Sequence, residues 1–196
     1  MLISRLSPRW YRKRRTLKGM LRNEEGISAV EFAFIAPVML LIYFGCVELS
    51  FLMRADRKVS ATAASLGDLT ARLAMVTDGD LRELYNAAGV LMQPYPVADA
   101  RMRITSVVDN GDGEKRVAWS EGHNIAPRAV NSLVTVPDGI VPSPGAIILT
   151  EVEYDYQSNI GFVLSEPMTM KDRFYLRPRR VHVIDRVGNS GAFGPS

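Results

Sequence analysis

A long apolar stretch with one carboxylate near its start constrains this chain more than any other feature. Residues 32–47 contain no charged residue, and the flanking segments 27–30 and 49–53 extend the stretch to 27 residues, interrupted only by Glu31 and Glu48. A bilayer core about 30 Å thick needs roughly 20 apolar residues in a helix, so this stretch is long enough to cross a membrane. The two glutamates are 17 residues apart, or about 25 Å on a helix, which predicts that they lie near the two membrane faces.

The basic residues predict the orientation of this span. Eight of them precede it within residues 1–26, whereas only Arg54, Arg57 and Lys58 closely follow it. The positive-inside rule therefore places the amino terminus in the cytoplasm and everything after about Met53 outside it.

A sequence pI of about 9.1 is also typical of proteins that bind nucleic acid. Residues 1–26 hold eight basic and two acidic residues, however, and the rest of the chain carries a net charge of −3. We therefore expect no nucleic-acid partner. A cleaved secretory signal, with a shorter apolar region and a small-residue cleavage site directly after it, fits the sequence less well than a retained membrane anchor.

The junction before the span resembles a known processing signal. A basic leader ending in Gly26, an apolar helix and a glutamate at the fifth position after that glycine resemble the class III signal of type IV pilins and pseudopilins. A finer similarity is to TadE-like minor pilins of the tight-adherence (Flp) pilus, through residues 26–33 followed by Pro37. Phe32 stands where the major Flp pilins favour tyrosine, which, with the chain's length, favours the minor-pilin branch.

The resemblance implies roles for four residues. A membrane prepilin peptidase would cut after Gly26 and leave Ile27 as the new amino terminus. Glu31 and Phe32 would act in assembly, with the Glu31 carboxylate pairing with a subunit amine. The implied partners are the inner membrane, the peptidase, other pilins and pilus assembly proteins; the implied location is the inner membrane, with the carboxy-terminal domain in the periplasm, or the extracellular pilus.

The chemistry of Glu31 agrees with this role without requiring it. A charged side chain at membrane depth costs about 2.5 to 3.5 kcal/mol on insertion scales, so such residues usually pair or mark function. The alternative is that Glu31 simply reaches the headgroup layer. For Glu48 we expect that simpler situation, at the outer membrane interface.

Apolar residues predict that the helix continues beyond the membrane. Positions recurring every seven residues, with a second set offset by three, form a stripe along one face (Leu52, Val59, Leu66, Leu73; Ala55, Thr62, Leu69, Val76). The stripe can pack against the chain's own domain or against neighbouring helices of a filament. Residues 77–80 predict a break and a new helix cap, followed by a short helix that ends before Pro94.

The pattern changes to strands from about Arg101. Residues 101–105 and 117–119 flank a cluster of turn formers at 109–113 and predict a β-hairpin. Residues 146–156 and 174–184 predict a second strand pair, and the proline-containing stretch between the pairs is predicted to be mostly irregular. The fold class is α+β and pilin-like, with a long membrane-spanning helix, a short second helix and an antiparallel sheet. The expected organisation is a basic cytoplasmic leader (1–26), a transmembrane helix (27–53), a helical stalk with the second helix (54–93), a β-rich periplasmic domain (94–187) and a flexible tail (188–196).

The sequence gives little support for catalysis. It contains His123 and His182, one cysteine (Cys46) and no metal-protease or phosphate-loop motif. We predict no catalytic, cofactor or metal residues, and a solvated turn in preference to a calcium site at residues 109–114. Two functions remain: a minor pilin used in pilus assembly for adhesion, or an uncleaved, single-pass periplasmic binding or sensory module.

Overall fold

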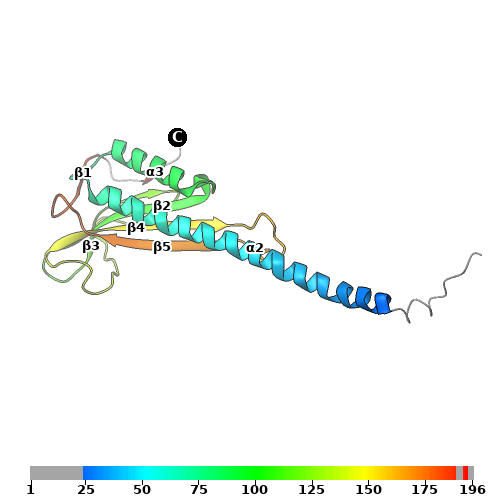
Figure 1. The fold of residues 1–196 in the computed structure, drawn as a ribbon. Coiled ribbons are helices and arrows are strands. Elements are labelled where there is room, and N and C mark those ends of the chain that lie inside the picture. The colour runs from blue at the N-terminus through cyan, green and yellow to red at the C-terminus, as the bar shows by residue number, and fades with distance from the viewer. Residues whose placement is uncertain (1–23, 189–191, 194–196) are drawn as a thin grey trace, which may run out of the picture. The chain divides into compact units, whose positions relative to one another are not determined.

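The computed structural model describes residues 24–188 and 192–193. It divides into two compact units, Met1–Cys46 and Val47–Ser196, which are described separately below. Most of the predicted leader and tail lie outside the described residues. Helix α2 (Glu24–Ala71) begins in the first unit and ends in the second (Figure 1).

The second unit contains the rest of the fold (Figure 1). After α2 come β1 (Met75–Val76), α3 (Asp78–Met92), the short 3-10 helix η1 (Val97–Asp99), β2 (Ala100–Asp109), β3 (Arg116–His123), β4 (Gly145–Tyr156), β5 (Met168–Leu176), β6 (Asp185–Arg186) and β7 (Ala192–Phe193). This arrangement confirms the predicted α+β class, with a long apolar helix, a second short helix and an antiparallel sheet.

The main sheet has the strand order β5-β4-β2-β3-β7. Strands β2 to β5 pair in antiparallel fashion, and β7 joins the β3 edge in parallel. A separate parallel pair joins β1 to β6, so segments more than 100 residues apart in the sequence meet there. The predicted hairpin is confirmed as β2 and β3.

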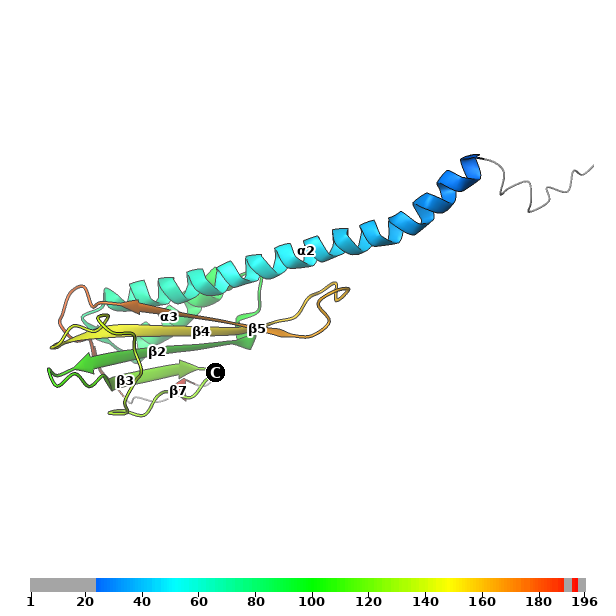
Figure 2. The ribbon, with the colours of Figure 1, turned by 90° about the horizontal axis from the view of Figure 1, so that it is seen from below.

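The main core lies between the helices and one face of this sheet (Figure 2). The helical stripe supplies Ala55, Val59 and Leu66 to it, all at most 1% exposed. Thr150 of β4 donates its hydroxyl hydrogen to the carbonyl oxygen of Ala63 at 2.9 Å, which ties α2 to the sheet. The chain's own domain therefore covers this part of the stripe.

The stripe also departs from prediction at its far end. Helix α2 stops at Ala71, and Leu73 and Val76 lie beyond it. Leu69 is 40% exposed, although it belongs to the same sequence pattern. The last turn tightens, since Leu73 N–H bonds to the Thr70 carbonyl oxygen at 3.1 Å, as is common at helix ends.

Helix α3 begins where its sequence predicts. Thr77 is the N-cap, and its hydroxyl accepts from Asp80 N–H at 3.2 Å while the Asp80 carboxylate accepts from Thr77 N–H at 2.8 Å. This reciprocal capping box satisfies backbone donors that the helix itself leaves open. Leu81 and Ala88 are fully buried in the core below.

The predicted strand at residues 174–184 is wrong in its bounds. Strand β5 starts earlier, at Met168, and ends at Leu176. Pro178 cannot donate a ladder hydrogen bond, which stops pairing at this point. The chain instead returns to the helix, where Arg179 N–H donates to the Ala71 carbonyl oxygen at 2.8 Å.

Candidate functional site

The predicted processing junction lies in the first turn of α2. The helix begins at Glu24, so Gly26 and Ile27 are both helical. Backbone N–H groups in the first turn of a helix have no acceptor within the helix. The junction is therefore less firmly held by backbone hydrogen bonds than the turns that follow, and the Ile27 side chain is 51% exposed.

Glu31 lies four residues after Ile27 in the same helix. Residues at this spacing share one helix face, with Cβ atoms about 5 to 6 Å apart. The Glu31 side chain is exposed, and within the described part of the chain no hydrogen bond or ion pair to it is found. A carboxylate and a new amino group at Ile27 would thus lie on the same side of the helix.

The helix around Glu31 is apolar and exposed on every side. Phe32 is 70% exposed, and the other large apolar side chains from Ile27 to Tyr43 are between 51% and 75% exposed. An all-apolar helix surface is typical of a membrane span or of a helix surrounded by others. Among the described residues this is the one helix that is long and apolar enough to cross a membrane.

Glu48, the second glutamate of the apolar stretch, has a different environment. Its side chain is fully buried in the second unit. The carboxylate accepts backbone N–H groups of Phe162 at 2.6 Å, Val163 at 2.9 Å and Leu164 at 2.8 Å. We expected Glu48 simply to lie at the outer membrane interface; the structure adds a role that the sequence did not predict, because Glu48 holds the loop between β4 and β5.

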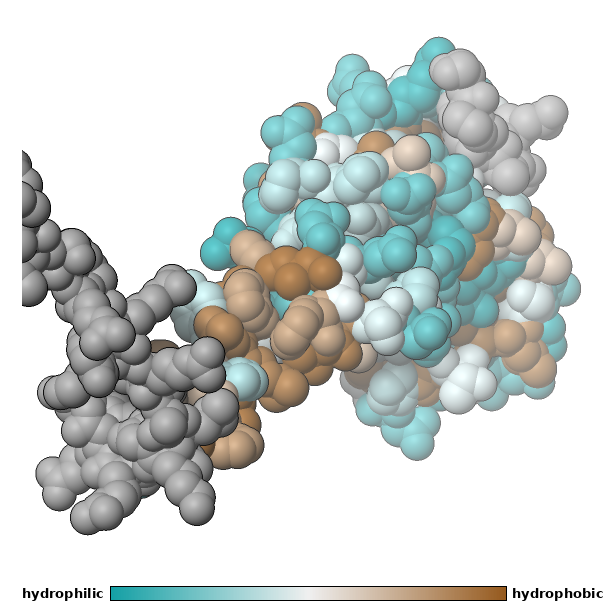
Figure 3. Space-filling model, turned by 90° about the vertical axis from the view of Figure 1, so that its right-hand side faces the viewer, coloured by the Kyte–Doolittle hydropathy of each residue, from teal (hydrophilic) through white to brown (hydrophobic). Residues whose placement is uncertain are grey.

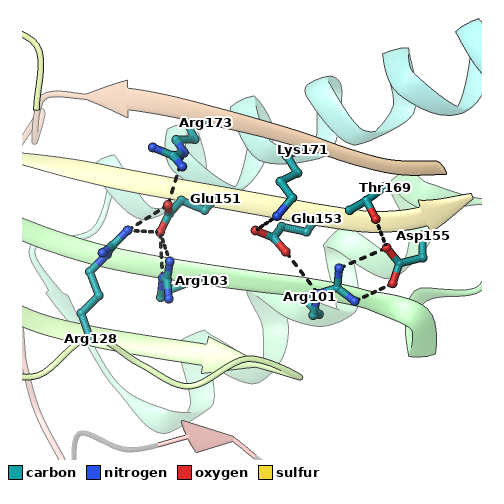
Figure 4. Close-up of polar contacts among 9 residues, drawn as sticks. All are labelled: Arg101, Arg103, Arg128, Glu151, Glu153, Asp155, Thr169, Lys171 and Arg173. Atoms are coloured by element: carbon teal, nitrogen blue, oxygen red, sulfur yellow. Dashed lines mark hydrogen bonds and ion pairs between the residues drawn. The ribbon is translucent and has the colours of Figure 1, made fainter. Parts of the chain in front are cut away.

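Glu151 is the centre of a charged cluster on the sheet face opposite the helices (Figure 4). Its carboxylate lies 2.7 Å from Arg103, 2.8 Å from Arg128 and 3.5 Å from Arg173. The Glu151 side chain is only 8% exposed, so these arginines balance a nearly buried charge.

Arg101 extends this cluster along the same face (Figure 4). It lies 3.2 Å from Glu153 and 2.6 Å from Asp155, and Lys171 lies 3.1 Å from Glu153. The Arg101 guanidinium, together with the Thr169 hydroxyl, lowers the pKa of Asp155 to about 2. This part of the face is polar and internally paired, which favours a solvated sheet surface over a ligand site.

The acidic turn at residues 109–114 is stabilised by its own backbone. Asp109 accepts N–H groups of Gly111 at 2.8 Å and Gly113 at 3.2 Å, and these bonds hold the pKa of Asp109 below its usual value. Asp112 accepts Glu114 N–H at 2.9 Å. Within residues 24–188 and 192–193, no group of three or more His, Cys, Asp or Glu side chains is arranged to hold a metal ion.

His123 stacks on Tyr85 with ring centroids 5.1 Å apart, and burial lowers its pKa. This is a packing contact of a partly buried ring.

Two sets of contacts were not predicted from the sequence. Glu48 is noticeable in the sequence as a charge within an apolar run, but no nearby residue indicates that its partner lies 114 residues away. The second set joins Arg186 to Glu121 at 2.8 Å and to Asp78, inside the domain. Their sequence neighbours carry no motif that would pair them.

Residues 26–66 match the family model described as TadE-like protein. The match includes Gly26, Ile27, Glu31 and Phe32 and covers about a fifth of the chain. It confirms the resemblance seen in the sequence of this segment. No curated protein and no solved structure gives a significant match to the chain.

Proposed function

We propose that this protein is a TadE-like minor pilin, or pseudopilin, that takes part in assembly of the tight-adherence (Flp) pilus and so in adhesion and surface colonisation. One observation carries the proposal: in the TadE-like segment, an exposed carboxylate at Glu31 lies one helical turn after Ile27, on an otherwise apolar and exposed helix.

The first part of α2 anchors the protein in the bacterial inner membrane. It is apolar on all sides, as a lipid-facing helix must be, and basic residues concentrate before it. The amino terminus is therefore cytoplasmic and the domain from about residue 54 is periplasmic.

Processing by a prepilin peptidase creates the group that Glu31 needs. Cleavage between Gly26 and Ile27 leaves an ammonium group at Ile27, one turn from the carboxylate. An ion pair in a medium of low dielectric is much stronger than in water, so the amine of the same or a neighbouring subunit neutralises Glu31 at little cost.

The part of α2 that contacts other subunits lies before Glu48 in the sequence. The stripe through Ala55, Val59 and Leu66 is already covered by the chain's own domain. The exposed side chains between Ile27 and Tyr43 remain for neighbouring pilins once the subunit leaves the lipid. Phe32, beside Glu31, is the most direct candidate for such packing.

Mass spectrometry of the mature amino terminus tests the processing step. The full chain is expressed with an active prepilin peptidase, and the membrane fraction is analysed. We expect a chain that begins at Ile27. An intact leader, in cells where the peptidase cleaves another pilin, would contradict the proposal and favour an uncleaved periplasmic module.

Glu31→Gln tests the assembly step separately. The amide keeps the shape of the side chain but removes its charge, so we expect normal membrane insertion and a loss of surface pili. Glu83→Gln is the matched control, because Glu83 is an exposed glutamate on α3. Equal piliation in the two variants would exclude the role proposed for Glu31.

A further inference from the structure

The loop between β4 and β5, residues 157–167, exposes an apolar tip. Ile160 is 41% exposed, Phe162 59% and Val163 50%. Much of the domain surface in Figure 3 is polar, coloured teal, so three large apolar side chains within four positions of one loop are unusual there. A contiguous exposed apolar group of this kind marks a contact with a partner or a membrane.

Glu48 fixes this tip beside the apolar helix. Its buried carboxylate accepts the consecutive backbone N–H groups of residues 162–164, at 2.6 to 2.9 Å. Directly after Glu48, α2 exposes Leu49 at 53% and Met53 at 50%. The loop tip is thus held at the level of Glu48, within the apolar stretch of residues 27–53.

Aromatic and cationic groups lie next to the tip. Tyr95, Tyr154 and Arg54 line one cavity with Asn159 of the loop. The Tyr95 ring lies 5.8 Å from that of Tyr154, edge to face. Tyr154 is buried, whereas Tyr95 is partly exposed and Arg54 is exposed. Tyrosine is enriched at the level of lipid headgroups, where its ring is apolar and its hydroxyl is hydrated, and arginine binds phosphate well.

We propose that the β4–β5 loop is a second membrane contact, whose apolar tip inserts into the outer interfacial layer of the bilayer that α2 crosses. This inference rests on the proposed membrane anchoring by α2. The lipid bilayer is the occupant because Glu48, within the apolar stretch, holds the tip by its backbone, and because Tyr95 and Arg54 border the loop. The contact gives the periplasmic domain a second attachment to the membrane, apart from its covalent link to α2.

Site-directed spin labelling of the full chain in lipid nanodiscs, with one copy per disc, tests the insertion. A nitroxide is placed at position 163 in the double variant Cys46→Ser/Val163→Cys. Collisions with oxygen, which concentrates in lipid, are compared with collisions with a water-soluble nickel chelate. The matched control is Cys46→Ser/Val130→Cys, because Val130 is also an exposed valine, at 58%. A third sample carries the label on the native Cys46, which is exposed on the apolar part of α2.

We expect oxygen collisions to exceed nickel collisions at positions 163 and 46, and the reverse at position 130. A label at 163 that behaves like the one at 130 would overturn the loop contact while leaving the anchor intact. Shielding of position 163 from both reagents would also overturn it, because protein and not lipid would then cover the tip. A nickel-accessible label at 46 would overturn the anchor itself. Ile160→Cys replaces Val163→Cys if the latter does not fold.

Discussion

Replacing Arg186 by methionine should destabilise the domain strongly. The Arg186 side chain is 4% exposed, and its Nε lies 2.8 Å from Oε1 of Glu121, which is 0% exposed. Removing one partner of a buried ion pair typically costs about 3 to 5 kcal/mol, because the remaining buried charge loses the attraction of that partner. For a domain of this size such a loss lowers the melting temperature by roughly 6 to 20 °C.

Urea unfolding of the full chain in detergent micelles measures this loss. Trp119 is the reporter, since its Nε1 donates to the carbonyl oxygen of Ile184 at 2.6 Å, two residues before the substituted position. A Trp10→Phe background removes the other tryptophan signal. The matched control is Arg72→Met, because Arg72 also pairs with a carboxylate but its side chain is 60% exposed. Exposed pairs contribute about 0 to 1 kcal/mol, so the control should unfold close to the unsubstituted protein.

The double variant Glu121→Met/Arg186→Met tests whether the loss of stability in Arg186→Met comes from the charge that remains on Glu121. If the cost of Arg186→Met comes from a buried uncompensated charge, removing that charge as well should restore much of the stability. A single variant as stable as Arg72→Met would refute the reasoning. So would a double variant whose loss equals the sum of the two single losses, since the residues would then act independently.

Three further predictions concern the domain, each measured by unfolding of the full chain. Arg101 holds the pKa of Asp155 at about 2, below the ordinary 3.8, so this pair should add stability above pH 4 that disappears as the pH falls toward 2. Asp155→Asn should reduce the change in the free energy of unfolding between pH 4 and pH 2 by about 0.5 to 1 kcal/mol, a small value because the site is partly solvated. An unchanged pH profile would contradict this prediction. Gly122→Ala should lower the free energy of unfolding by about 1 to 3 kcal/mol, because the new Cβ would lie 2.0 Å from the backbone oxygen of Ile125. Unchanged stability would show that the backbone at Ile125 can move away without cost. Thr77→Ala should cost about 1 kcal/mol by removing the cap of α3, and no loss would show that the cap is dispensable.

The elements that the sequence predicted are those specified by nearby residues. Periodic apolar positions and the capping box at Thr77 and Asp80 determine α3 within a few turns. The hairpin of β2 and β3 follows from alternation on both sides of a glycine-containing turn. The predicted processing junction rests on the same kind of local pattern, because Gly26 and Glu31 are separated by only a few residues.

The elements that the sequence did not predict depend on distant segments. Strands β1 and β6 have two residues each and exist because they pair with each other across more than 100 positions. The extent of β5 is determined by its register with β4, from Tyr156 opposite Met168 to Ile148 opposite Leu176. Two short segments without a periodic pattern give no local signal of such pairing.

The two glutamates of the apolar stretch, Glu31 and Glu48, differ in whether the fold supplies partners for their carboxylates. Both interrupt an apolar run. The domain satisfies Glu48 with three backbone N–H groups, so its presence is explained within one chain. Glu31 is exposed on a helix whose surroundings are apolar, and in the described part of the chain nothing balances it. In the function proposed above, the balancing charge is the new amino group that processing would create at Ile27.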